Sequence, residues 1–136
     1  MPPGPIIESE CIAAFPWEQS IVISPAGADA VAGTAVAYFD LLYAVTLTAV
    51  LLTTDSANPP TGSTAIVDIN EAGTSVLSTK LSIDAGEVSS ATAATPPVIS
   101  DSSLASGARI SFDIDQIGSG NAGRTYTVTM KGTRTL

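Results

Sequence analysis

The sequence predicts an all-β protein, an antiparallel β-sandwich of about eight strands with a jelly-roll-like topology. Apolar and polar residues alternate with period two in several short segments, most clearly at 110–115 and 125–130. Clusters of Gly, Pro, Asn and Asp separate such segments, as turns do. An Ala-rich stretch at 28–37 has some helix propensity, but Gly33 weakens a helix there and β-favouring residues follow.

The 136 residues fit one domain, with an extended N-terminal arm expected at residues 1–20 and the sandwich at 21–136. Proline prevents helix formation and disfavours regular strand pairing. Four of the nine prolines lie in this arm, namely Pro2, Pro3, Pro5 and Pro16. Its apolar side chains would be costly to leave in water, so we expect the arm to lie on the sandwich or on another subunit.

The candidate partner-binding residues of the arm are Ile6, Ile7, Phe15 and Trp17. Trp17 is the only tryptophan of the chain, and two interpretations of it stay open. It could form the edge of the protein's own core, or it could anchor an interface, because tryptophan is enriched among the residues that dominate binding.

Three strands are expected in the first half of the chain, at 21–24, 34–39 and 43–51. Every second residue of the third strand would face the core, and these residues are Tyr43, Val45, Leu47, Ala49 and Leu51. A surface loop is expected at 55–62, followed by a hairpin at 65–77. In the hairpin Ala65, Val67 and Ile69 would share one face, and Gly73 would supply the positive φ that tight turns need.

In the second half, a short alternating segment at 80–86 precedes a Ser/Thr/Ala-rich strand expected at 88–95. Asp101 could cap a single helical turn. Two strands would then contribute core residues, namely Ile110, Phe112 and Ile114 from the first and Tyr126, Val128 and Met130 from the second. The glycine-rich segment 118–123 is expected to join these two strands as a hairpin loop.

Two blocks of the sequence carry a resemblance to a known family. In the first, Pro59 to Leu77, a loop ending in Pro-Thr-Gly leads to an Ile-Val-Asp-Ile-Asn strand and a glycine turn into a Thr-rich strand. The second, Val98 to Ser119, passes through Leu-Ala-Ser-Gly and ends in Arg-Ile-Ser-Phe-Asp-Ile-Asp-Gln-Ile-Gly-Ser. The chain resembles small β-sandwich proteins of tailed-bacteriophage virions over roughly residues 45–130, and the shared motifs are structural.

Such sequences occur as capsid decoration (cement) proteins, head fibres and tail-fibre modules. The resemblance therefore implies a virion protein that is made in the host cytoplasm and binds the capsid exterior. The expected partner is the major capsid protein, and a site on a threefold axis implies a homotrimer. The alternative is a receptor-binding or fibre-tip module that recognises a host surface glycan through exposed aromatic residues. A third class, a glycan-processing enzyme, would require a buried carboxylate in a cleft.

Composition argues against several partners. Thirteen acidic and five basic residues give a net charge of −8, which repels nucleic acid and anionic membranes. The most apolar run, 41–52, is too short to span a bilayer as a helix, and the N-terminus does not resemble a secretory signal. We therefore expect neither nucleic acid nor a membrane as a partner.

The sequence offers little material for catalysis or for metal binding. With no histidine and with Cys11 as the only cysteine, the usual zinc sites, a Ser-His-Asp triad around Ser119 and an intrachain disulfide are all excluded. Asp113 and Asp115 would share a strand face, with Asp68 on a neighbouring strand, as a calcium site requires. A solvated acidic face explains them more simply, so no enzyme activity, cofactor or metal is expected.

Overall fold

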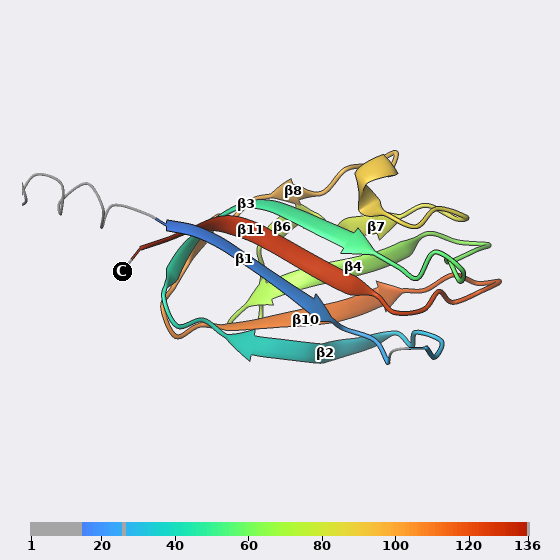
Figure 1. Cartoon of the computed structure of the whole chain (residues 1–136), viewed down its shortest axis with the longest axis horizontal. Coiled ribbons are helices and arrows are strands. Elements are labelled where there is room, and N and C mark those ends of the chain that lie inside the picture. Colours follow the sequence, from blue (N-terminus) through green and yellow to red (C-terminus); the bar gives the residue numbers. More distant parts are fainter. Residues whose placement is uncertain (1–14, 26, 136) are drawn as a thin grey trace, which may run out of the picture.

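The computed structural model describes residues 15–25 and 27–135, which form two antiparallel β-sheets packed face to face (Figure 1). The all-β fold class expected from the sequence is confirmed. Ile6 and Ile7 lie outside the described residues. Among the residues that are described, no helix is long and apolar enough to cross a membrane.

The long strands of the described part are β1 (Phe15–Val22), β2 (Gly33–Asp40), β3 (Ala44–Thr53), β4 (Ala65–Glu71), β10 (Arg109–Gln116) and β11 (Thr127–Thr135). Between β4 and β10 the elements are short: β5 (Thr74–Ser75), β6 (Leu77–Thr79), β7 (Leu81–Ile83), the 3₁₀ turn η1 (Ser90–Thr92), β8 (Val98–Ile99) and β9 (Ser103–Leu104).

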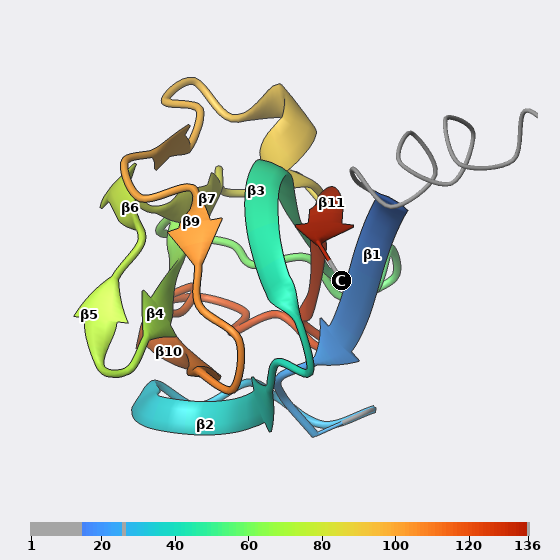
Figure 2. The ribbon, with the colours of Figure 1, turned by 90° about the vertical axis from the view of Figure 1, so that its left-hand side faces the viewer.

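The strand order is that of a jelly roll. One sheet has the order β1-β11-β3-β9, and the other has the order β2-β10-β4-β5, with β7 also paired to β4. Figure 2 shows the two layers end-on, and β6 and β8 form a separate pair. The first strand pairs with the last, the second with the next to last, and β3 with β9. The chain is thus one long antiparallel hairpin rolled into a sandwich, as expected.

The core lies between the two sheets and is built from the alternating residues that the sequence indicated. The inward side chains of β4, β10 and β11 are fully or almost fully buried, among them Ala65, Val67, Ile69, Ile110, Phe112, Ile114, Val128 and Met130. Phe112 packs against Phe39 of β2, with ring centroids 6.1 Å apart. The hairpin expected at 65–77 is also confirmed at its turn, where Ala72 and Gly73 both have positive φ values of 49° and 86°.

A β-bulge changes which residues of β3 face the core. Val45 and Leu47 are buried as expected, but Ala49 is exposed and Leu52 is buried in place of Leu51. The partner strand β11 pairs Lys131 with Ala49 and Gly132 with Leu47, so one β3 residue is passed over and the alternation shifts. Gly132 is needed at this point, because a Cβ there would collide with the Thr46 carbonyl.

The boundary expected between arm and sandwich was wrong. Phe15 to Ser20 belong to β1, which pairs with β11 along its whole length. Pro16 is tolerated there because β1 is an edge strand, and a proline without an N–H can occupy such a strand. The sandwich therefore includes Phe15 to Ser20 and does not begin at residue 21.

Two local predictions in the second half were also wrong. The segment 88–95 is not a strand: it contains η1, and the buried hydroxyl of Ser90 accepts a hydrogen bond from the Leu52 amide. Asp101 does not cap a helical turn, because its carboxylate accepts from the Ser103 amide at the start of β9. In both places short side-chain contacts to the backbone replace the regular structure that propensity suggested.

The glycine-rich segment 118–123 is not a hairpin loop, because β10 and β11 lie in different sheets. It crosses between the sheets and packs on the loop around Thr61, whose amide donates to the Asn121 carbonyl at 2.9 Å. The Gly120 amide donates to the Thr61 carbonyl at 2.9 Å. Gly118 has no room for a side chain, because a Cβ there would meet the Thr61 and Asn121 backbone. Close approach of two loops, rather than flexibility, accounts for these glycines.

Tyr126 fixes the end of this crossing. Its ring is fully buried, its hydroxyl donates to the Ala122 carbonyl at 2.5 Å, and its amide donates to the Ser24 hydroxyl at 2.8 Å. A tyrosine bonded to the backbone a few residues upstream is a known stabilising corner of β-sandwiches. Burial raises the pKa of the Tyr126 phenol from 10.0 to about 12.

This pKa predicts alkaline unfolding. Between pH 10 and pH 12 the phenol loses its proton in the unfolded chain but keeps it in the folded one, so stability falls as pH rises through this range. The melting temperature of Tyr126→Phe should fall less between pH 10 and pH 12 than the melting temperature of the wild type. At pH 8 the variant should be less stable by about 1 kcal/mol, because one hydrogen bond is lost. Parallel declines for both proteins would contradict the assignment.

Candidate interaction surface

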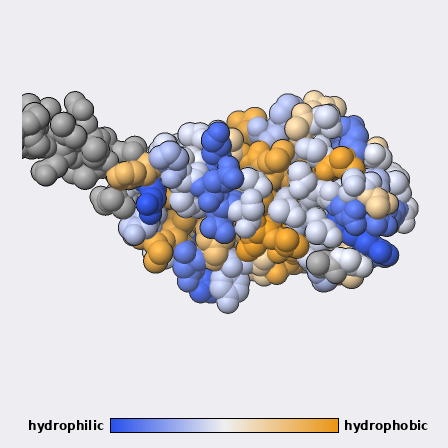
Figure 3. Space-filling model, viewed as in Figure 1, coloured by the Kyte–Doolittle hydropathy of each residue, from blue (hydrophilic) through white to orange (hydrophobic). Residues whose placement is uncertain are grey.

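The sandwich is open along one side, between β1 and β2, which are the free edges of the two sheets. We call this the β1–β2 side. Exposed apolar side chains lie along it, including Val22 (48 % exposed), Val31 (69 %) and Val36. Figure 3 shows hydrophobic residues gathered across the middle of the face that carries these two strands. A shallow cavity of about 380 Å³ lies among them and reaches Ile114 of the core.

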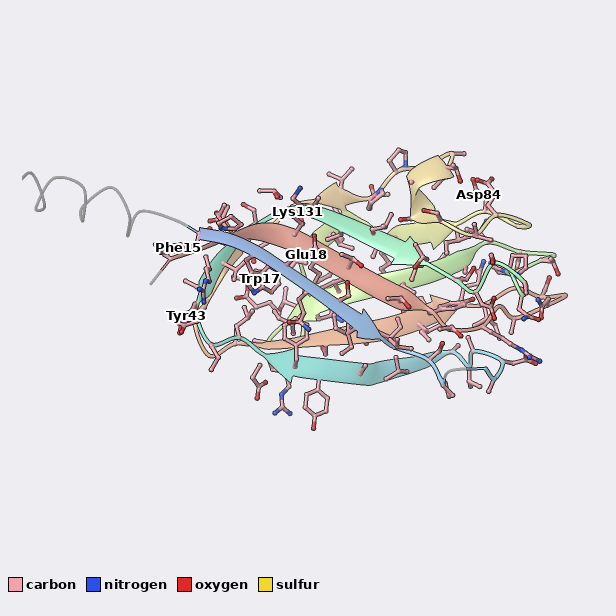
Figure 4. All side chains as sticks on the ribbon, viewed as in Figure 1. Phe15, Trp17, Glu18, Tyr43, Asp84 and Lys131 are labelled. Atoms are coloured by element: carbon pink, nitrogen blue, oxygen red, sulfur yellow. The ribbon has the colours of Figure 1, made fainter. Side chains whose placement is uncertain are left out.

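A second hollow lies on the same side, where β1 begins, and we call it the end cavity. It has a volume of about 200 Å³. Its lining comes from four strands and from the β2–β3 connection: Trp17, Gln19, Phe39, Asp40, Leu41, Leu42, Tyr43, Val45 and Arg134. Leu42 is 81 % exposed at this end. Figure 4 shows Phe15, Trp17 and Tyr43 at this end of the sandwich, with Asp84 at the opposite end.

Arg134 holds the aromatic residues of this end together. Its guanidinium lies 4.7 Å from the centroid of the Tyr43 ring and 5.7 Å from that of Phe15, its cross-strand neighbour. Both contacts are within the range of cation–π attraction. Among the described residues Arg134 forms no ion pair with a carboxylate.

The other cations divide into two groups. Lys80, Arg109 and Arg124 each form an ion pair, whereas Lys131 forms none within the described part of the chain. Lys131 faces Glu18 across the β1–β11 pair, at the middle of β11 (Figure 4). Within the described residues, the two cations without a carboxylate partner, Lys131 and Arg134, therefore both lie on β11.

The structure brings together two of the four predicted site residues. Phe15 and Trp17 lie on β1, and Trp17 both packs against the protein's own core and lines the end cavity. Ile6 and Ile7 lie outside the described residues. Sequence reasoning missed Leu42 as part of this surface. It placed Tyr43 on the core face of a strand, whereas Tyr43 lies before β3 and is 38 % exposed. The available signal for this surface was the apolar pair Leu41 and Leu42, which directly follows Asp40 at the end of β2.

The three aspartates considered as a calcium site lie on the second sheet. Asp68 and Asp113 are direct cross-strand neighbours. The Asp113 carboxylate accepts from the Ala35 amide at 2.8 Å and from the Asn70 side chain at 3.0 Å. That of Asp68 accepts from the Ser75 hydroxyl at 2.6 Å. The carboxylate oxygens of Asp68 and Asp113 thus accept hydrogen bonds from donor groups of the protein itself.

Lys80 completes this network. Its ammonium donates to Asp115 and lies 3.9 Å from Asp68. The hydrogen bond to Asp115 raises the pKa of Lys80 above its ordinary value. Among residues 15–25 and 27–135, no three Asp, Glu, Cys or His side chains are placed to hold a metal ion.

Comparison with known proteins found no matching family model, no matching curated protein and no matching solved structure.

The polar network predicts that the fold does not depend on calcium. A chelator such as EDTA should leave the melting temperature unchanged, because the oxygens of Asp68 and Asp113 already accept hydrogen bonds from the protein. Differential scanning fluorimetry with and without the chelator is the measurement. A large drop that added calcium reverses would show that these aspartates bind the ion.

Proposed function

We propose that this protein is a structural component of a tailed-phage virion, a cement protein that binds the outer surface of the capsid. It would act as a homotrimer whose partner is the major capsid protein, and its role would be adhesion without catalysis. The resemblance of residues 45–130 to small virion β-sandwiches supports this proposal, and so does the jelly-roll fold of the described part.

The observation that carries the proposal is the apolar β1–β2 side. Burial of apolar surface contributes roughly 25 cal/mol per Å², so Val22, Val31 and Leu42, which are 48–81 % exposed, would stabilise an assembly that covers them. The free edges of β1 and β2 add unpaired backbone groups that a neighbouring chain can use. This side therefore suits contact with protein.

Adhesion at a capsid axis gives the mechanism. A cement protein bridges neighbouring capsomers, and each bridge turns later contacts into intramolecular ones with a high effective concentration. Many individually weak contacts then resist the pressure of the packaged genome. A threefold or quasi-threefold axis requires three equivalent surfaces, which a homotrimer provides.

One observation favours the alternative, a module that binds a host surface glycan. Tyr43 lies in the β2–β3 connection and Tyr38 on β2 is 54 % exposed, so aromatic rings are accessible near one end. However, a guanidinium covers one face of each ring, with Arg109 4.1 Å from the centroid of the Tyr38 ring and Arg134 above Tyr43. Binding of the isolated protein to intact host cells, lost in Tyr38→Ala, would favour this alternative over the cement role.

Removal of residues 1–14 should separate folding from attachment. The cut falls directly before β1, so the β1–β11 pairing stays intact and the truncated protein should fold. Its occupancy on particles that lack the wild-type protein should fall sharply, because each buried isoleucine of the arm contributes about 1.5–3 kcal/mol before ordering costs. Circular dichroism and particle co-sedimentation are the measurements.

A longer deletion, of residues 1–22, is the matched control, because it also removes β1 and should destabilise the sandwich. If the 1–14 deletion still decorates particles at wild-type occupancy, the sandwich and not the arm holds the contact. If that shorter deletion unfolds the protein, residues 1–14 belong to its core.

The oligomeric state gives a second test of the cement role. At micromolar concentration the full chain should scatter light as a trimer, because covering the β1–β2 side removes its exposed apolar residues from water. Val31→Ser and Leu42→Ser, two substitutions on this side, should shift the equilibrium toward monomer. Val98→Ser, on β8, is the control. A wild-type protein that remains monomeric would remove the main reason for placing it on a threefold axis.

A further inference from the structure

We propose that the end cavity is the binding site for Ile6 of a neighbouring copy, so that copies of this protein exchange their N-terminal arms. This inference rests on the proposed homotrimer and names the contact that would hold it together. In this arrangement the arm of one copy binds in the end cavity of another copy.

The size and chemistry of the end cavity suit an aliphatic side chain. Its walls include Trp17, Phe39, Leu41 and Val45, and its volume is about 200 Å³. An apolar cavity of about 150 Å³ holds a benzene molecule, so this one can take one or two branched aliphatic groups. The lining also includes Gln19, Asp40, Tyr43 and Arg134, so we place the isoleucine side chain against the apolar residues of the cavity.

The arm carries negative charge, and the cavity lining contains one cation, Arg134, and one carboxylate, Asp40, which is paired with Arg109. Residues 1–14 contain two acidic residues, Glu8 and Glu10, and no lysine or arginine. Side chains two apart lie on the same side of an extended chain, so Ile6 in the cavity would place Glu8 about 7 Å farther along the same side. Arg134 lines the cavity and has no carboxylate partner among the described residues, so it is available to pair with Glu8.

The sequence before β1 favours a neighbour's cavity over the protein's own. To enter its own end cavity, the chain would have to reverse direction between Ile7 and Phe15. The seven residues in between contain no Gly, Pro, Asn or Asp, and Ser9 is the one residue among them of a type that is common in turns. Continued in an extended form, the eight steps from Phe15 to Ile7 span up to about 28 Å, enough to reach an adjacent sandwich. Prolines at positions 2, 3 and 5 lower the entropy lost on docking.

Disulfide trapping tests the exchange directly in the isolated full-length protein. In a Cys11→Ser background, Ile6→Cys is combined with Leu42→Cys, a rim position whose exposure makes the substitution mild. After mild oxidation, a non-reducing gel should show covalent dimers and trimers. In the matched control Leu42→Cys is replaced by Val98→Cys, which is also exposed but lies on β8, and these species should be absent.

Three outcomes would overturn the inference. These are a disulfide within one chain, shown by mass spectrometry of a monomer without free thiols; no disulfide at all; and equal crosslinking in the Val98→Cys control. The readout does not involve capsids. If the trapped trimer forms but wild-type protein does not bind particles, arm exchange stands and the cement role fails. If wild-type protein binds particles but no disulfide-linked trimer forms, the cement role stands and arm exchange fails.

A charge exchange keeps the test informative if the cysteine variants fold poorly. Glu8→Arg and Arg134→Glu should each weaken the trimer. The protein concentration at which half of the trimer has dissociated should rise about tenfold, as expected for the loss of a close charge pair. The double variant restores opposite charges and should recover most of the loss. Equal effects in the single and double variants would show that Glu8 and Arg134 do not meet.

Discussion

The fold depends on β11, which is hydrogen-bonded along its length to β1 on one side and to β3 on the other. It joins the first described residues to the last and supplies Val128 and Met130 to the centre of the core. Nearly every major contact therefore links segments far apart in the sequence, which slows folding in antiparallel β-proteins. Because β11 is the last described strand, the first sheet cannot close before the residues up to Thr135 have been synthesised.

The fold class and the central core could be predicted from the sequence, because β4, β10 and β11 each show an apolar face with period two. What could not be predicted depends on contacts between distant residues. The alternation of β3 shifts where Gly132 allows a bulge against Thr46, and nothing within β3 signals this. The start of β1 at Phe15 was hidden because Pro16 is permitted only by its position on an edge.

Phe15 and Trp17 were recognised as candidate site residues from their apolar character alone. Their meeting with Tyr43 and Arg134 is set by strand register, which a single sequence does not contain.

In the second sheet, hydrogen-bond donors and a cation offset the repulsion between two neighbouring carboxylates. Asp68 and Asp113 lie directly opposite each other, an arrangement that is unfavourable between like charges. The donors Ser75 and Asn70 bind one carboxylate each, and Lys80 adds a positive charge nearby. The Ala35 amide, on a residue with a positive φ of 49°, also donates to Asp113. The carboxylate thus stabilises a backbone conformation in β2 that non-glycine residues rarely adopt. The acidic residues of this face are structural members of the sheet.

The long free edges of the described sandwich both lie on the β1–β2 side. At the opposite side the edges are β9, β5 and β7, of two or three residues each. Such short edges are poor templates for a further strand. Edge-to-edge association can therefore proceed from one side of each molecule but cannot continue from the other. Of the described strands, β1 and β2 are therefore the two edges that offer a long row of backbone groups to a further strand.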